Sequence, residues 1–398
     1  MTNSRQPLQT LYVPADRVTR STVPEFGAEA LRLIEEHAPD ADAFVDAFGV
    51  PVDFAEPTRD RTLLRLERMP VEDLRVDFED GYGVRPDAEE DGHAESAAEA
   101  VREAVAGPWV VTTVPPDEPR PSWFGLRVKS FDDEGLRMRS LRTLDRFVST
   151  LVGEAGGLPD GFVVTFPKVT DPEQVEAFAR ALGDLEGALG LADRSLRFEV
   201  QVETPRSVLG PDGAVAAPRM LEAGDGLISA MHLGVFDYTA SLGLMPWEQR
   251  LDHPANDFAR QVLQVALAGT GVWISDGSSN LVPASDRTVD VRAAWRVHAN
   301  HVRHSLSGGF RQGWDLHPSH LVSRYAAVYG WLLPHLNDAV ERVRAWRDGS
   351  SASGVLDEPA TITSLLRYLR FAVSSGAVDE ADVVQDTGLG RDELFPGG

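Results

Sequence analysis

Short runs rich in valine, isoleucine, leucine and phenylalanine recur between helical stretches, and this alternation constrains the fold more than any other feature. Such runs are typical of buried strands, and strands separated by helices indicate a parallel sheet. We expect eight strands, at Thr10–Pro14, Leu74–Phe78, Gly125–Ser130, Gly161–Val169, Leu196–Glu203, Gly226–Leu233, Gly271–Ser275 and Gly309–Leu316. The predicted intervening helices include Glu25–Glu36, Ala94–Ala106, Gly135–Val152, Pro172–Leu189, Asp257–Ala268 and Val289–Leu306.

Eight strand–helix units favour a closed (β/α)8 TIM barrel, an α/β fold, over an open doubly wound sheet. An open sheet that binds a dinucleotide usually has Gly-x-Gly-x-x-Gly after an early strand, and this chain has none there. Barrels of this type commonly exceed 200 residues as one unit, which suits a chain of 398 residues. The open sheet is the alternative.

Two regions extend beyond the expected barrel units. The first connection, residues 18–69, is far longer than a usual βα loop and contains a second helical stretch around Thr58–Arg68. The last part of the chain is predicted to form helices at Leu321–Leu333, Ala339–Arg347 and Thr361–Ser374, around a Gly/Ser-rich break at Asp348–Gly354. We therefore expect a catalytic barrel over residues 1–320, including the insertion, and a helical C-terminal extension over 321–398.

Charge and composition exclude several classes of function. The chain has 62 acidic and 38 basic residues and a formal net charge of −24, so we expect neither nucleic acid nor a membrane as a partner. It has no cysteine, which excludes disulfides, thiolate zinc sites and cysteine nucleophiles. Because no apolar leader or membrane-length apolar stretch is present, we expect a cytoplasmic protein.

Charged residues gather where the predicted strands end, and the active site of a (β/α)8 barrel is built at these carboxyl ends. They are Asp77, Glu79 and Asp80 after the second strand, Arg127 and Lys129 in the third, Lys168 after the fourth, Glu203 after the fifth, Asp237 after the sixth, Asp276 after the seventh, and Asp315 and His317 after the eighth. Carboxylates without cysteine favour a hard cation, Mg²⁺ or alternatively Mn²⁺. Such an ion could polarise a 2-keto acid while an arginine holds its carboxylate.

Seven motifs follow one another in an order that resembles a known family. They are Tyr12-Val13-Pro14-Ala15-Asp16-Arg17, Val76-Asp77-Phe78-Glu79-Asp80, Leu126-Arg127-Val128, Phe166-Pro167-Lys168-Val169, Val202-Glu203-Thr204-Pro205, Gly234-Val235-Phe236-Asp237 and His317-Pro318-Ser319. In this order they resemble the citrate lyase β-subunit-like family, which belongs with malyl-CoA and citramalyl-CoA lyases in the HpcH/HpaI aldolase and malate synthase-like superfamily. The resemblance covers about residues 10–320.

The resemblance implies a (β/α)8 barrel with a magnesium ion held directly by Glu203 and Asp237. It places Asp77, Glu79 and Asp80 behind metal-bound waters, and Arg127 beside a substrate carboxylate or enolate oxygen. It also places Arg17, His317 and Pro318 near the mouth for CoA or substrate, and the backbone amides of Gly234, Val235 and Phe236 near the keto-acid carboxylate. Members of the superfamily are commonly oligomers, so the resemblance implies a homo-oligomer.

We therefore expect a carbon–carbon lyase or aldolase that cleaves or forms a 3-hydroxy acid or its CoA thioester, with glyoxylate, pyruvate or oxaloacetate as the keto-acid partner. The alternatives are a Schiff-base aldolase that uses Lys168, a thioester hydrolase on the same scaffold, and a non-catalytic metabolite-binding barrel. We expect Lys168 to form an ion pair or to act electrostatically. For His298, His301 and His304, a solvated helix face is the expectation and a metal site the alternative. Whether CoA is used stays open.

Overall fold

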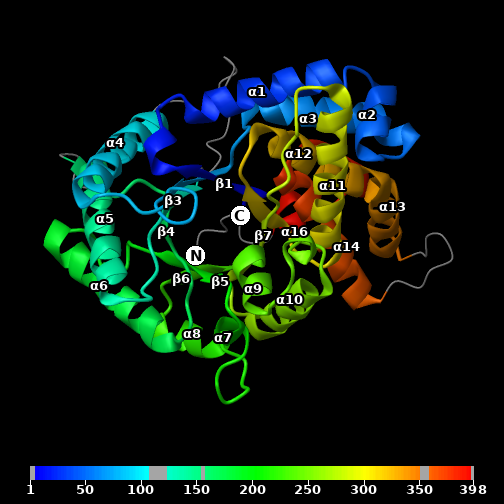
Figure 1. The fold of residues 1–398 in the computed structure, drawn as a ribbon. Helices are drawn as coiled ribbons and strands as arrows, with labels where there is room; N and C mark the ends of the chain where they lie inside the picture. The colour runs from blue at the N-terminus through cyan, green and yellow to red at the C-terminus, as the bar shows by residue number, and fades with distance from the viewer. Residues whose placement is uncertain (1–4, 107–122, 154–156, 350–357, 396–398) are drawn as a thin grey trace.

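Eight parallel strands close into a barrel in the computed structural model, which describes residues 5–106, 123–153, 157–349 and 358–395 (Figure 1). Each strand pairs with the next along the chain, and the last pairs with the first. The strands are β1 (Gln9–Pro14), β2 (Asp73–Asp77), β3 (Trp123–Arg127), β4 (Phe162–Phe166), β5 (Phe198–Val202), β6 (Ile228–Leu233), β7 (Trp273–Ser278) and β8 (Gln312–Asp315). The predicted TIM barrel is therefore confirmed.

A ring of helices surrounds the strands. It consists of α4 (Asp87–Ala106), α5 (Glu134–Val152), α6 (Pro172–Leu189), α8 (Ala217–Ala223), α10 (Pro254–Leu267), α11 (Thr288–Ser307) and α12 (Pro318–Leu332). Two short helices, α7 (Pro205–Val208) and α9 (Val235–Ser241), directly follow the carboxyl ends of β5 and β6. Local sequence sets the helix ends: Asp171 caps α6 by accepting the N–H of Gln174, and Gly190 ends it at φ +65°.

The insertion after β1 packs on the outside of the barrel. It forms α1 (Thr22–His37), α2 (Ala41–Phe48) and α3 (Ala55–Arg68), which lie along α11 and α12 (Figure 1). The ring of Phe48 stacks on Trp295 of α11 at a centroid distance of 5.1 Å, and Tyr325 of α12 donates a hydrogen bond to the Pro70 carbonyl. The sequence predicted α1 and α3 but missed α2.

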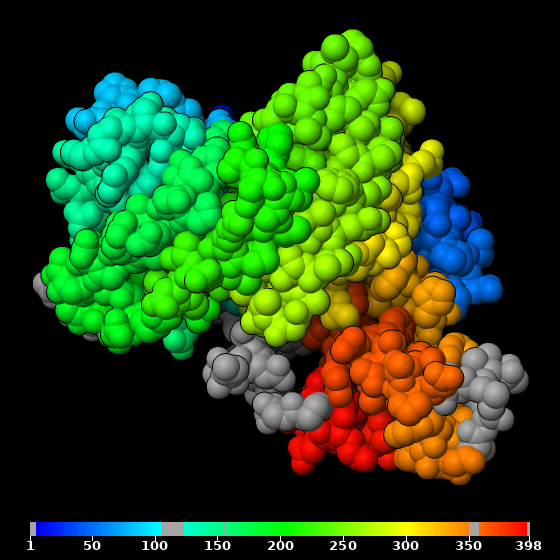
Figure 2. Space-filling view, turned by 90° about the horizontal axis from the view of Figure 1, so that it is seen from below, coloured from blue at the N-terminus to red at the C-terminus, as the bar shows by residue number. Residues whose placement is uncertain are grey.

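The C-terminal helices α13 (Leu336–Arg347), α14 (Pro359–Ser375), α15 (Glu380–Thr387) and α16 (Arg391–Leu394) lie beside the barrel. Figure 2 shows them, orange to red, as a lobe that projects from one side. They contact the amino-terminal side of the strands, where Arg311, just before β8, lies over the ring of Phe371 at 4.5 Å. The last barrel helix, α12, begins at Pro318, ahead of the expected boundary at residue 320. Of the expected break, residues 350–354 lie outside the described residues.

The interior of the barrel holds a buried polar network. Arg75 Nη2 lies 2.7 Å from Asp73 Oδ2 and 3.2 Å from Glu199 Oε2, and His232 Nε2 lies 3.3 Å from the same Glu199 atom. Burial alone would raise the pKa of Glu199, but Arg75 and His232 lower it to about 2. Because each charge has an opposite partner, the network supports the strands without an uncompensated buried ion.

The described helices include none that is long and apolar enough to cross a membrane.

Candidate active site

A cavity of about 340 Å³ opens at the carboxyl ends of the strands. Its lining includes sequence-predicted residues from distant parts of the chain: Arg17, Asp77, Asp80, Arg127, Glu203, Gly234, Val235, Phe236 and Asp237. The remaining lining residues are Tyr12, Pro14, Gly81, Ser278, Asn280, Trp314 and Leu316. The barrel therefore gathers charges from its first, second, third, fifth and sixth strands at one mouth, which is where barrels of this type place their chemistry.

Asp77, the last residue of β2, fixes Arg127 at the mouth. Arg127 Nε lies 2.7 Å from Asp77 Oδ1 and Nη2 lies 2.8 Å from Oδ2, a bidentate pair. The loop after Asp77 folds back so that the N–H groups of Glu79 and Gly81 also donate to this carboxylate. A Cβ at Gly81 would lie 2.6 Å from Asp77 Oδ2, so this close approach requires glycine. Burial lowers the pKa of Arg127, but Asp77 and Glu79 outweigh it and leave the pKa raised.

Lys168 links the loops that follow β2, β4 and β6. Its Nζ contacts Glu79, lies 2.7 Å from Asp80 Oδ1 and lies 3.6 Å from Asp237 Oδ2. Burial lowers the pKa of Lys168, but Glu79 and Asp80 outweigh it, so the pKa lies above its usual value. This arrangement agrees with the predicted ion pair. The backbone of Lys168 has φ +53°, an uncommon conformation for a residue other than glycine, and such strain often accompanies functional sites.

Glu203, which directly follows β5, is a buried carboxylate. Burial, together with the nearby carboxylates of Asp237 and Glu79, raises its pKa to about 8, although Arg127 and Lys168 oppose the rise. In the described part of the chain, no basic side chain lies within ion-pair distance of Glu203; its Oε1 accepts the backbone N–H of Lys168 at 2.6 Å. Glu203 and Asp237 thus line one cavity, and only Asp237 has an ion-pair partner, Lys168 at 3.6 Å. Two carboxylates in one cavity are a donor set that suits a hard divalent cation.

Gly234 leaves the space that Glu203 occupies. A Cβ at Gly234 would lie 2.3 Å from both Glu203 Cβ and Oε2, far closer than any side chain tolerates. The N–H of Gly234 already donates to the Val202 carbonyl at 3.0 Å. Of the three predicted amides, those of Val235 and Phe236 therefore stay available to a substrate. These are the first residues of α9, so their N–H groups have no acceptor within the helix.

Two of the carboxylates at strand ends point away from the cavity. Asp276 in β7 pairs with Arg260 of α10 at 2.9 Å, and Asp315 in β8 pairs with Arg324 of α12 at 2.7 Å. Side chains alternate along a strand, so these aspartates face the outer helices while their neighbours face inward. Both serve to attach helices to the barrel.

Three further residues near the mouth also lie outside the cavity lining. Lys129 Nζ pairs with Glu90 of α4 at 3.1 Å, on the outer side of β3. His317 caps α12, because its Nδ1 accepts the backbone N–H of Ser319 at 3.2 Å, and Pro318 is the first residue of that helix. The described geometry gives His317 and Pro318 a role in starting α12.

Sequence reasoning missed the aromatic side of the cavity. Tyr12 and Trp314 lie against each other with ring centroids 4.8 Å apart, and the Arg127 guanidinium lies 5.0 Å from the Tyr12 ring. Trp314 donates its indole N–H to His232 Nδ1 at 2.8 Å, which connects the cavity to the polar network below it. The sequence signal for Trp314 is the alternation of side chains along β8. Because Asp315 faces the outer helices, the residue before it, Trp314, faces inward.

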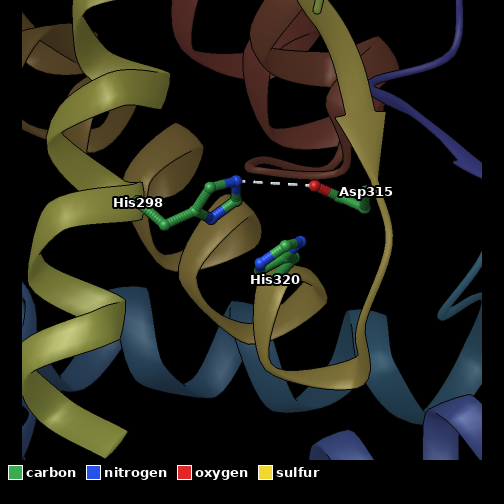
Figure 3. A group of neighbouring side chains, drawn as sticks. All are labelled: His298, Asp315 and His320. Carbon is green, nitrogen blue, oxygen red and sulfur yellow. Dashed lines mark ion pairs between the residues drawn. The ribbon is translucent and has the colours of Figure 1, made fainter. Parts of the chain in front are cut away.

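Three buried side chains that could hold a metal converge behind β8: His298, Asp315 and His320 (Figure 3). Their existing contacts oppose this use. The two imidazole rings stack at 4.5 Å and 22°, so their in-plane nitrogens run side by side instead of pointing at one ion. His320 Nε2 lies 2.8 Å from the Leu281 carbonyl, and both oxygens of Asp315 accept from Arg324. The group joins α11, β8 and α12 by hydrogen bonds and packing.

The expectation of a solvated histidine face on α11 is wrong for two of its three members. His298 and His301 are buried, and His298 Nδ1 lies 2.7 Å from the Ser323 hydroxyl. His304 is partly exposed and lies 2.7 Å from Asp257 of α10. Because α12, α2 and α1 pack against α11, the helix has less free surface than its sequence indicated.

Solved structures of the same fold include a citrate lyase from Burkholderia xenovorans, which is 20% identical, with 83% of this chain and 92% of that chain covered and a TM-score of 0.57. A Haloferax volcanii malate synthase in a lead(II) complex is 15% identical, with 99% of each chain covered and a TM-score of 0.53. Its magnesium and glyoxylate complex is 15% identical, with 98% and 100% covered and a TM-score of 0.52. At these identities the likeness shows the fold, and it agrees with the resemblance stated from the motifs.

A comparison with curated proteins finds no match. One family model, described as "Domain of unknown function (DUF6986)", matches residues 1–396. The match extends over the barrel, the insertion and the C-terminal helices together. The chain therefore belongs to the DUF6986 family.

Proposed function

We propose that this protein is a magnesium-dependent carbon–carbon lyase or aldolase. It would cleave or form a 3-hydroxy acid, free or as its CoA thioester, with glyoxylate, pyruvate or oxaloacetate as the 2-keto acid. The observation that carries the proposal is the buried carboxylate of Glu203, which has no ion-pair partner among the described residues and lies in the same cavity as Asp237 and Arg127.

The donor set fits a divalent cation. A buried carboxylate without a partner is costly, and Glu203 has no ion-pair partner among the described side chains. Mg²⁺ binds through one or two carboxylates and keeps several waters, so Glu203 and Asp237 would hold it while Asp80 contacts its waters. When bound, the ion would polarise the carbonyl oxygen of the keto acid.

The side chains of this protein would orient the substrate and stabilise its charge. Arg127, held in place by Asp77, would donate to the keto-acid carboxylate or to the oxygen that becomes negative during carbon–carbon cleavage. The N–H groups of Val235 and Phe236 would meet the same carboxylate group at the start of α9. Tyr12 and Trp314 would exclude water from one side of the reacting carbons.

The geometry disfavours the Schiff-base alternative. A lysine nucleophile must lose its proton, and the Lys168 ammonium is held by the carboxylates of Glu79 and Asp80. Its raised pKa keeps it charged. Lys168 serves better as a fixed positive charge that balances the acidic loop after β2.

The decisive experiment is isothermal titration of metal-stripped protein with glyoxylate, pyruvate and oxaloacetate, each with and without Mg²⁺. We expect binding that requires Mg²⁺ and is absent in Glu203→Gln, whereas the exposed control Glu173→Gln binds as the wild type does. Binding without metal, or no binding, would contradict the proposal.

A turnover assay then separates the remaining alternatives. With a 3-hydroxyacyl-CoA substrate whose C3 also carries a carboxylate, the proposed enzyme breaks the C2–C3 bond and releases a 2-keto acid and a shorter acyl-CoA. Free CoA with an intact hydroxy acid would instead identify a thioester hydrolase. Covalent labelling by borohydride in the presence of substrate and EDTA would identify a Schiff-base enzyme, and ligand binding without any product would identify a binding protein.

A further inference from the structure

A second cavity, of about 230 Å³, lies at the opposite end of the barrel from the candidate active site. Arg5 and Arg65 line it, and both contact Glu72. Arg5 precedes β1 and Glu72 precedes β2, so this cavity lies at the amino-terminal ends of the strands. It is bounded by α3, by Tyr329 of α12 and by residues 373–380 at the junction of α14 and α15. The volume is several times the roughly 30 Å³ of a liquid water molecule.

The lining of this cavity is basic in a strongly acidic chain. Four arginines line it, namely Arg5, Arg61, Arg65 and Arg68, although the net charge of the chain is −24. Glu72 is shared by Arg5 and Arg65, and Asp379 pairs with both terminal nitrogens of Arg61 at 3.0 Å.

The remaining carboxylates leave this positive charge in excess. Glu380 on the rim pairs with Arg391, at 2.6 Å. The hydrogen-bonded Asp379 raises the pKa of the Arg61 guanidinium although burial lowers it, and the more distant Asp382 adds to the rise. Among the described residues, no carboxylate lies within ion-pair distance of Arg68, which is exposed on α3. Arg68 is therefore free to bind an anion.

Arg65, whose guanidinium lies 5.4 Å from the Tyr325 ring, has two donor nitrogens without an acceptor among the described residues. Its side chain is 3% exposed, and its Nε and Nη1 have no hydrogen-bond acceptor in the described part of the chain. Buried donors without acceptors are costly, and the cost is greater for a charged group. Nη1 lies near Gly376, which also lines the cavity: a Cβ built on this glycine would be 3.7 Å from Nη1. Burial also lowers the pKa of Arg5, which shares the one carboxylate of Glu72 with Arg65.

We infer that this cavity binds a compact oxyanion with two negative charges, either inorganic phosphate or the phosphoryl group of a small phosphomonoester. Guanidinium groups bind phosphate oxygens through paired hydrogen bonds, and Arg5, Arg65 and Arg68 approach from two separate elements. A monoanion would offset less of the excess positive charge. The cavity has room for a phosphoryl group with a few attached carbon atoms.

The bound anion would connect three parts of the molecule: the segment before β1, the insertion helix α3, and the junction of α14 and α15. It would therefore stabilise the attachment of the C-terminal helices to the barrel. Ligands that bind only the folded state raise its stability in proportion to ln(1 + [L]/Kd). Phosphate should accordingly raise the Tm of the full chain.

The test uses Arg68→Gln, which removes the exposed cation without breaking a buried pair. Its matched control is Arg180→Gln, which removes an exposed arginine of α6 that pairs only with Glu176 in the described structure. Isothermal titration is done without divalent metal at pH 8 and constant ionic strength. The probes are inorganic phosphate, glycerol 1-phosphate and acetate.

We expect wild type and Arg180→Gln to bind one phosphate per chain, more tightly than acetate, and Arg68→Gln to bind it at least about tenfold more weakly, the loss typical of one charge-assisted contact. Glycerol 1-phosphate that binds better than phosphate would identify the phosphomonoester as the source of the anion. Equal affinity in both variants, or no binding to the wild type, would overturn the inference. The rise in Tm caused by phosphate is an independent second measurement: it should be equal in wild type and Arg180→Gln and smaller in Arg68→Gln.

Discussion

The backbone N–H of Lys168 donates a hydrogen bond of 2.6 Å to Oε1 of Glu203. Lys168 can do so because its backbone lies in the left-handed region, at φ +53°. The same turn sends its side chain toward Glu79 and Asp80. Lys168 therefore orients the Glu203 carboxylate with its main chain and balances the charges of Glu79 and Asp80 with its side chain. In this way the loop after β4 connects the acidic groups at the mouth of the barrel.

Replacing Glu203 with glutamine should lower activity and raise stability in the absence of metal. The amide keeps the shape of the side chain and can still accept the Lys168 N–H, but it removes a carboxyl group whose pKa burial and Asp237 raise to about 8, so that folding no longer opposes its ionisation. We expect turnover to fall by more than the about 10- to 100-fold typical of changes around metal ligands. Thermal unfolding in EDTA should give a Tm equal to or above that of the wild type. A lower Tm with unchanged turnover would show that Glu203 is structural.

Replacing Arg127 with lysine should impair the reaction although the charge is kept. An ammonium cannot make the bidentate pair with Asp77, so its position at the cavity is no longer fixed. We expect kcat/KM to fall by about 100- to 1000-fold, the range for loss of one donor to a developing oxyanion. The control Arg146→Lys, on the exposed face of α5, should keep full activity. Steady-state kinetics on both variants checks this prediction.

The strands were predictable because buried strands consist mainly of apolar residues. Runs such as Phe162–Phe166 are apolar except for Thr165, and near-continuous apolar runs are typical of strands in a parallel sheet. The helix Ala41–Phe48 was missed because it is short, and its ends depend on a cap at Asp40 and a left-handed Gly49. β7 continues to Ser278, beyond the predicted end at Ser275, through polar residues that are not typical of strands.

The carboxylates of the site were predictable from position alone, but their directions were not. Glu203 and Asp276 both lie at strand ends, yet Glu203 faces the cavity and Asp276 faces α10. A shift of one residue in register reverses the face of a side chain, and the sequence does not fix that register. For the same reason Trp314 was missed. The strained turn at Lys168 depends on tertiary contacts that no local pattern reveals.

Replacing Gly234 with alanine should displace Glu203 and reduce Mg²⁺-dependent ligand binding. The new Cβ would lie 2.3 Å from Glu203, so either the carboxylate or the start of α9 must move. Overpacking of this kind typically costs about 1–3 kcal/mol in stability. Gly183→Ala is the control, because a Cβ there meets nothing within 4 Å and alanine favours its helix, α6. Titration calorimetry and urea unfolding measure both effects; normal binding by Gly234→Ala would mean that Glu203 does not need its present position.

Stability should fall as the pH drops below about 6.5, in part because of His298. Burial lowers the pKa of His298 well below its usual value, and the nearby His320, Arg324 and His301 add to this. Below the unfolded pKa of about 6.5, the unfolded chain takes up a proton that the folded chain does not, so unfolding is favoured by up to about 1.4 kcal/mol per pH unit. Above that pH the difference disappears. Urea unfolding at pH 8.0, 6.5 and 5.5 should show a steeper loss for wild type and for the exposed control His335→Gln than for His298→Gln. Parallel slopes in all three proteins would mean that His298 takes up its proton as easily in the folded chain as in the unfolded one.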